Sequence, residues 1–586
     1  MRRRLIVGLL LALAGCREKS RAPAAPPVAD AARTDPNARL DELARQYLDE
    51  SADASPATAT WLGLHGYDDK LDDTSAAAQA SELARLRHTL ELLEATGDAT
   101  LDEQHRLDRR VFLRDVRLAL YELEELRPFE RSPIRYVDLV SSSIFDLLAR
   151  DTVPLGDRLR PITARLGRVR PLLDEARRNL HNPPELAVRR AIDLAGGTRS
   201  FLADTLPRIA SYASDERLLP DFRAAQGDAV RALGDFINFL QHDLLPRSHG
   251  DLALGKERLL DELKIREQLD APVDTLAAQL ASAGDRELKV AVKRYEEAAR
   301  AVAPGKSPAE ALRLLEDDHP SAEELMPTVA RTVAEVLAFA RDHRLLTVPS
   351  EPAPKVVEMP PYLWGFMLLV TTGPFETHPS YTFYVDPVDR TWDKKTVDEH
   401  LRSFHRPQIA MSAINQALAR FAMAEAARRT RTRVEHFSTG TAIESGFSRY
   451  LDQVVLDEGF GGGDPRMRLV QRREVLLQTC RFVAALRFHA LGAKLEDVTR
   501  IFGDQADLDD AVARREAERV ALDASVFDEA LGMLALFALR DEVQKQRGAA
   551  FSLAAYHDEL LSHGAQPLGL LRRRLLPTAD AEAPVF

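Results

Sequence analysis

The side chains that could bind a catalytic metal do not form a standard motif in this chain. None of the 15 histidines is followed directly by a glutamate. The His-Glu-x-x-His pattern, which places two zinc ligands and a general base on one face of a helix, is therefore absent. A rebuilt zinc site would have to draw on His405, His436, Glu444 and His489, which lie in separate segments.

Nucleophilic chemistry has no better support from the sequence. Gly440, Ser445 and Gly446 do not form a Gly-x-Ser-x-Gly turn, and no predicted strand precedes them. Cys480 lies inside a helical pattern of apolar residues, where a small buried side chain is expected rather than a reactive thiol.

The N-terminus has the pattern of an export signal. Arg2, Arg3 and Arg4 precede an apolar run at residues 5–14, which is too short to span a membrane. The run ends in Leu-Ala-Gly-Cys, which resembles a bacterial lipoprotein box with Cys16 as the lipidated residue. This resemblance implies an exported protein that is lipid-anchored at a bacterial membrane, on its periplasmic face or at the cell surface.

The remaining chain is typical of one large helical domain. Residues 1–15 are predicted to be the signal peptide, 16–37 the lipidated cysteine and a flexible tether, and 578–586 a C-terminal tail. Residues 38–577 form the helical domain, which could divide into lobes at 38–250 and 251–577. The formal net charge of -12 argues against nucleic-acid binding.

Helical periodicity dominates the domain, and one region departs from it. Amphipathic segments are expected at 76–96, 102–126, 155–180, 183–206, 220–244, 259–280 and 285–302. Residues 348–387 are instead rich in proline and aromatic residues, and 381–385 alternate as a short strand would. The predicted fold is therefore mainly α, with a small irregular β-containing insertion.

Several segments share their order with one known family. They are Gly373-Pro374-Phe375-Glu376, Glu399-His400-Leu401-Arg402, Phe404-His405-Arg406-Pro407, Phe488-His489-Ala490-Leu491-Gly492 and Tyr556-His557-Asp558. Together with Pro56, Leu62-Gly63 and His65 near the start, they make the chain similar to the domain-of-unknown-function 885 family of bacterial zinc-hydrolase-like proteins. The resemblance implies a two-lobed helical bundle around a cleft, as in helical zinc peptidases.

The same resemblance implies that the zinc site has been lost. Where family members carry a His-Glu-x-x-Pro-Gly-His box, this chain has Asn415, Gln416 and, at the last position, Phe421. The position of the distal carboxylate ligand holds Ser445, and Glu529 stands where a tyrosine is expected. Amides and a phenyl ring cannot replace zinc ligands and a general base, so zinc is expected for the family but not for this chain.

Two functional hypotheses follow from this pattern. The first is a non-catalytic envelope lipoprotein that binds a peptide or a protein in the cleft, with Arg449, Tyr450 and His489 as candidate cleft-lining residues. The alternative is an active hydrolase whose non-standard site in the same cleft uses Glu444, Tyr450, His436 or His489.

Overall fold

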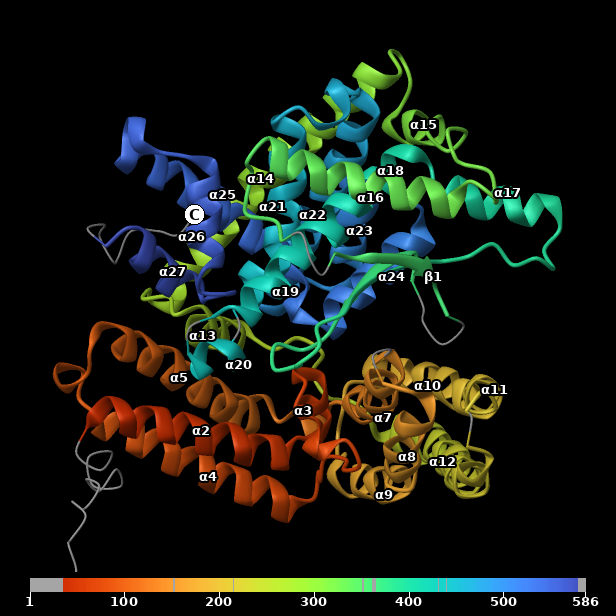
Figure 1. Cartoon of the computed structure of the whole chain (residues 1–586), viewed down its shortest axis with the longest axis vertical. Coiled ribbons are helices and arrows are strands. Elements are labelled where there is room, and N and C mark those ends of the chain that lie inside the picture. Colours follow the sequence, from red (N-terminus) through yellow and green to blue (C-terminus); the bar gives the residue numbers. More distant parts are fainter. Residues whose placement is uncertain are drawn as a thin grey trace, which may run out of the picture.

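The computed structural model describes residues 35–577 except 151–152, 214, 350–352, 361–364, 431 and 439. The mainly helical fold with a small sheet is confirmed, and the helices surround three main hydrophobic cores (Figure 1). The signal peptide, Cys16 and the C-terminal tail lie outside the described residues. Within them, no helix is both long and apolar enough to cross a membrane.

The first core lies within the N-terminal helices and is small. Leu86, Val111 and Phe112 are fully buried there, and Val434 and Leu570 join them from the C-terminal half of the chain. The first helix begins at Pro36 with Asp35 as its N-cap, inside the segment expected to be a tether. The elements of this part are α2 (Pro36–Ala54), α3 (Pro56–Leu62), η1 (His65–Tyr67), α4 (Ala76–Ala95), η2 (Asp98–Thr100), α5 (Glu103–Tyr121) and η3 (Glu122–Leu126).

The second core follows directly in the sequence and stands beside the first (Figure 1). It is built from an aliphatic interior around Phe222 and Phe236, both buried on α12. Its elements are α6 (Pro128–Arg131), α7 (Pro133–Ala149), α8 (Leu155–Leu166), α9 (Val169–Asn179), α10 (Glu185–Ser200), η4 (Phe201–Thr205), α11 (Leu206–Ala210), η5 (Glu216–Leu218), α12 (Leu219–Phe239), η6 (Leu240–Leu244) and η7 (Leu245–Arg247).

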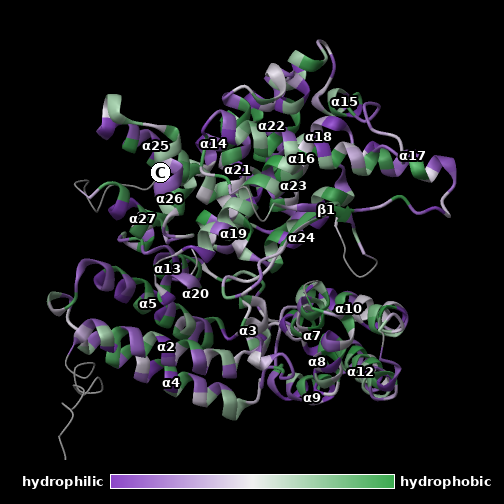
Figure 2. Ribbon diagram, viewed as in Figure 1, coloured by the Kyte–Doolittle hydropathy of each residue, from purple (hydrophilic) through white to green (hydrophobic). Residues whose placement is uncertain are grey.

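The third core is the largest and contains residues 413–421, the segment that the family resemblance aligns with a zinc box. Hydrophobic residues fill the interior of this body, while polar residues cover its outer helix faces (Figure 2). Its helices are α13 (Lys256–Glu267), α14 (Val273–Val302), α15 (Pro308–Arg313), α16 (Leu325–Asp342), α17 (Lys394–Arg402), α18 (Arg406–Ser412), η8 (Ala413–Arg420), α19 (Phe421–Arg428), α20 (Arg433–Phe437), α21 (Thr441–Asp457), η9 (Phe460–Gly463), α22 (Pro465–His489), α23 (Leu495–Ala506), α24 (Asp510–Leu522), η10 (Ala524–Phe527), α25 (Asp528–Arg547), η11 (Gly548–Ala550), α26 (Leu553–Leu561) and α27 (Leu568–Leu575).

The irregular insertion contributes a three-stranded sheet to this body. The strands β1 (Lys355–Glu358), β2 (Met367–Thr371) and β3 (Tyr381–Val385) are ordered β1-β3-β2. The central strand β3 pairs parallel with β1 and antiparallel with β2, and all five of its residues are buried. Because β3 is covered on both faces, its alternating sequence pattern does not produce an exposed side.

Two glycines join the start of the domain to this insertion. The amide of Phe375 donates to the carbonyl of Leu62 over 2.9 Å. A Cβ on Gly373 would lie 2.2 Å from the carbonyl carbon of Leu62, and one on Gly63 would lie 2.6 Å from the nitrogen of Glu376. The two segments therefore pack backbone to backbone, which explains why glycine stands at both positions.

Candidate functional site

The segment with Asn415, Gln416 and Phe421 lies on one continuous helical path with an altered middle. The chain runs from α18 through η8 into α19, and its backbone stays in the right-handed helical region at both junctions. The helix therefore continues without a break through Ala419 and Arg420. Residues Ala413–Arg420 nevertheless adopt π-helical hydrogen bonding, which the sequence did not predict and which often marks functional positions.

Asn415 and Gln416 pair with each other on this π segment. The Gln416 amide nitrogen donates to the Asn415 side-chain oxygen over 2.7 Å, and the Leu369 amide of β2 approaches Gln416 Oε1 at 3.4 Å. Asn415 is 7 % exposed, and its Nδ2 makes no well-formed hydrogen bond among the described residues. A carboxamide pair can hold strand β2 against the helix, but neither group can accept a proton as a general base does.

Phe421, at the last position of the box, is a core residue. It is fully buried, and its ring meets the ring of Tyr381 edge-on with centroids 4.8 Å apart. The Tyr381 hydroxyl in turn hydrogen-bonds to the Glu425 carboxylate one helical turn further on. This position therefore ties the helix to strand β3 through aromatic packing.

A partly buried arginine, Arg449, dominates the polar region beside Asn415. The Arg449 guanidinium forms ion pairs with Asp452 at 3.0 Å, Glu529 at 2.5 Å and Glu474 at 3.7 Å. These carboxylates come from α21, α25 and α22, so one cation joins three helices. Burial raises the pKa of Asp452 to about 7, although Arg449 lowers it, and the side chain of Asp452 is only 1 % exposed.

Close helix packing positions this cluster. A Cβ on Gly446 would lie 2.4 Å from Gly532, and one on Gly532 would lie 1.7 Å from the carbonyl oxygen of Ala442. The crossing of α21 and α25 at these glycines brings Glu529 to Arg449. Ser445 and Glu444 are exposed on α21. Desolvation by the surrounding protein raises the pKa of Glu444, although the positive charge of Arg420 opposes this shift. Glu444 therefore occupies a recessed position at the surface.

The residues considered for a rebuilt site are engaged elsewhere. His489 is buried, with Nε2 2.9 Å from the carbonyl of Val520 and Nδ1 accepting from the amide of Leu254. Tyr450 is fully buried and hydrogen-bonds to His557 Nε2 at 2.8 Å.

The other two histidines serve local structure. His405 is the N-cap of α18, where its Nδ1 accepts from the Gln408 amide, and burial lowers its pKa to about 4. His436 Nε2 lies 3.3 Å from the carbonyl of Arg428, and its ring packs beside Phe375.

The side chains present do not fit a zinc ion. Over the described part of residues 35–577, no group of three or more His, Cys, Asp or Glu side chains is placed to hold a metal. At the former box the donors are two amides, and the neighbouring carboxylates already face a guanidinium. The structure brings Asn415, Gln416, Arg449 and Glu529 together, while Phe421 packs away from them against Tyr381.

The partners of Arg449 were missed in the sequence. Asp452 stands three residues after Arg449 on the same helix, a spacing that is typical of an intrahelical ion pair. The three-residue spacing could therefore have indicated the ion pair between Arg449 and Asp452. Glu474 comes from a different helix, and nothing in its local sequence indicates the contact.

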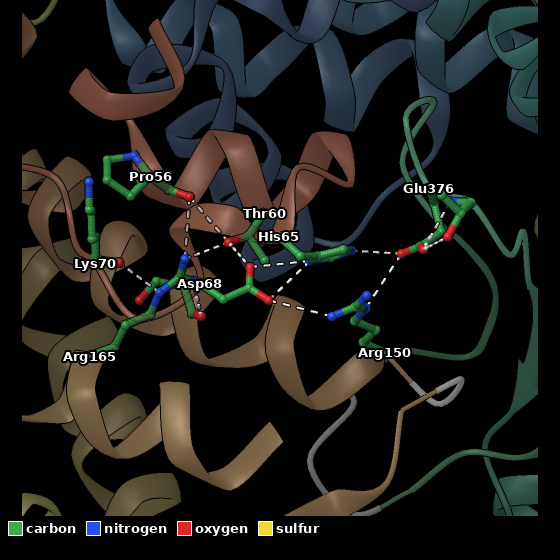
Figure 3. Close-up of polar contacts among 10 residues, drawn as sticks. Pro56, Thr60, His65, Asp68, Lys70, Arg150, Arg165 and Glu376 are labelled. Atoms are coloured by element: carbon green, nitrogen blue, oxygen red, sulfur yellow. Dashed lines mark hydrogen bonds and ion pairs between the residues drawn. The ribbon is translucent and has the colours of Figure 1, made fainter. Parts of the chain in front are cut away.

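A second polar cluster joins the N-terminal helices to the insertion (Figure 3). The His65 ring lies between two carboxylates, with Nδ1 3.0 Å from Asp68 and Nε2 2.7 Å from Glu376. Arg150 approaches the same two carboxylates at 3.5 and 3.4 Å. Behind them, Thr60 donates to Asp68, and the fully buried Arg165 donates to Thr60.

The charges in this cluster favour protonated His65. Burial lowers the pKa of His65, but its hydrogen bonds to Asp68 and Glu376 outweigh that effect and leave the pKa raised. Desolvation raises the pKa of Glu376, and His65 and Arg150 reverse the shift so that it is lowered. We interpret the cluster as a structural joint between parts of the chain far apart in sequence.

These observations define a large helical protein whose polar centre is an arginine–carboxylate network beside an amide-bearing π helix. The chain belongs to the family described as "Bacterial protein of unknown function (DUF885)", whose family model matches residues 56–575. No curated protein matches the chain.

Two solved structures share the fold. One, from Shewanella oneidensis, has a TM-score of 0.76 at 18% identity and covers 92% of this chain and 99% of its own. The other, from Colwellia psychrerythraea, has a TM-score of 0.74 at 16% identity and covers 92% of this chain and 98% of its own. Both are described as a "putative lipoprotein", the first of unknown function.

Proposed function

We propose that this protein is an exported, lipid-anchored and non-catalytic member of its family, which acts by binding a peptide or a protein. The observation that carries the proposal is the Arg449 cluster. A guanidinium paired with Asp452, Glu474 and Glu529 lies next to Asn415, in the region where family members would hold zinc. A positive side chain in this position neutralises the carboxylates and would repel a divalent cation.

The anchor rests on separate evidence. The sequence Leu-Ala-Gly-Cys ends a basic and apolar leader at Cys16, and the Shewanella and Colwellia structures named above are each described as a putative lipoprotein. Acyl chains on one cysteine can hold a domain of this size at a membrane surface without a spanning helix. The binding role is the function that remains for a domain with the fold of its family but without the expected zinc ligands and general base. The fold alone does not make the protein a hydrolase.

Fractionation of a bacterial host that expresses the full-length chain tests the anchor. We expect the wild-type protein to sediment with membranes and to incorporate radiolabelled palmitate, and the Cys16→Ser variant to lose both properties. Cys480→Ala is the matched control, because Cys480 is buried and should leave the anchor unchanged. Retention of the Cys16→Ser variant in the membrane fraction, with label, would overturn the assignment.

A further inference from the structure

A large cavity lies between the first and second cores, away from the former zinc box. The cavity has a volume of about 1330 Å³ and is partly open to solvent. One wall comes from the second half of α2, from α3 and from the start of α4, and the facing wall comes from α7. The cavity thus separates the two N-terminal helix groups, which stand side by side in Figure 1.

The lining of this cavity is strongly acidic. Lys70, Arg85, Arg135 and Arg168 are the basic residues that line it. The acidic residues are more numerous: Asp49, Glu50, Asp53, Asp72, Asp73, Glu82, Glu122, Asp138 and Asp146. Lys70 pairs with Asp53, and Arg85 pairs with Glu50 and Glu82, so two of the basic side chains are already neutralised.

Three carboxylates in the cavity have no close counter-ion. Glu122, Asp138 and Asp146 form no ion pair within 4.0 Å among the residues that the structure describes. Asp146 is half-buried, and desolvation raises its pKa to about 6 against the opposing charge of Arg165, whereas Glu122 and Asp138 are exposed. A bound cation would stabilise the ionised form of all three.

One further residue indicates that the lining can hold a ligand. Trp61 lines the cavity and leaves 53 % of its surface exposed, although large aromatic side chains are normally covered. An exposed indole can attract ammonium and guanidinium groups.

We propose that this cavity binds a peptide segment that carries lysine or arginine side chains. Lysine and arginine side chains carry a positive charge at the end of an apolar chain. They therefore complement the acidic lining, the unpaired carboxylates on α7 and η3, and the exposed Trp61. The cavity exceeds the roughly 300–1,000 Å³ that encloses a drug-sized ligand, which favours a segment of several residues over a single amine. This site is separate from the Arg449 region and does not depend on the loss of zinc.

Fluorescence anisotropy with the purified full-length protein in detergent micelles tests the proposal. The probe is a fluorescein-labelled peptide of four Lys-Ala repeats, and the comparison peptide has four Gln-Ala repeats. We expect the lysine peptide to bind at low salt, the glutamine peptide to bind at least tenfold more weakly, and the affinity of the lysine peptide to fall as salt is added.

Charge removal inside the cavity should weaken binding of the lysine peptide. The Asp138→Asn, Asp146→Asn double variant is expected to lose about tenfold in affinity or more. The matched control is the Glu335→Gln, Asp504→Asn double variant, which removes the same charge from exposed positions on the third body and should change affinity less than twofold. If the first double variant does not fold, Glu122→Gln alone provides the test, with the same direction expected.

Three outcomes would overturn the proposal. The first is equal binding of the two peptides, and the second is unchanged affinity for the lysine peptide in the folded cavity variants. The third is an equal loss of affinity in the control variant, which would indicate a general charge effect. Spermidine binding as tightly as the lysine peptide, with the same dependence on Asp138 and Asp146, would overturn the assignment to a peptide.

Discussion

At the residue scale, the carboxylates beside Asn415 are neutralised by a cation that the protein itself provides. The carboxylates of Asp452 and Glu529 lie where a bound cation would be favourable, and Arg449 supplies that cation from the protein itself. The family resemblance predicts that Asn415, Gln416 and Phe421 stand where other members have zinc ligands and a general base. It could not show that Arg449 connects three helices, because that depends on side chains distant in sequence.

The His65 joint gives a stability prediction that depends on pH. The folded pKa of His65 is raised, so its contribution is fully present below the unfolded pKa and is lost as pH rises through the folded pKa. His65→Gln should therefore lower the free energy of unfolding by about 1–3 kcal/mol at pH 6. The loss should be clearly smaller at pH 9, because the neutral imidazole no longer attracts Asp68 and Glu376.

Urea unfolding followed by circular dichroism at both pH values measures this difference. His88→Gln is the control, since the His88 side chain is 71% exposed and should change stability little at either pH. A loss for His65→Gln that is the same at pH 6 and pH 9 would show that His65 contributes through packing and not through its charge.

At the element scale, the crossing of α21 and α25 fixes the position of the arginine cluster. Gly532→Ala would place a Cβ 1.7 Å from the backbone oxygen of Ala442, so one helix would have to move. We expect a destabilisation of more than about 4 kcal/mol, or failure to fold. Thermal unfolding and the yield of soluble protein measure this effect.

A second glycine provides the control for this prediction. Gly196 lies on α10, and a Cβ at this position would meet nothing within 4 Å, so Gly196→Ala should be neutral or stabilise the protein by up to about 1 kcal/mol. A Gly532→Ala variant that is as stable as Gly196→Ala would contradict the close helix contact.

The sequence predicts some elements well and misplaces others, for identifiable reasons. The strand expected at 381–385 is β3 with the same bounds, because its aromatic and β-branched residues favour a buried strand. The two helical segments expected at 259–280 and 285–302 are divided elsewhere, because α14 runs without interruption from Val273 to Val302. A Cβ on Gly284 would lie 3.0 Å from the Phe482 ring, so the glycine permits close packing on α22. The chain instead breaks between α13 and α14, where Gln268 has a positive φ and Pro272 follows.

At the scale of the whole molecule, the sequence predicts the helical class but not the arrangement of the cores. Local periodicity identifies which face of each helix is apolar, and it cannot show that Leu570 completes a core made by residues near 40 and 112. The acidic cavity was missed for the same reason. Its carboxylates lie on α2, on the loop before α4, on α4, on η3 and on α7, and only packing of the first core beside the second brings them together.

Metal analysis of the purified full-length protein tests the central claim most directly. After growth in zinc-supplemented medium, inductively coupled plasma mass spectrometry should find far less than one zinc per chain, because the two amides and the Arg449 cation do not offer a zinc site. A family member that retains the His-Glu-x-x-Pro-Gly-His box, prepared in parallel, should retain close to one. A near-stoichiometric zinc content in this protein would contradict the account.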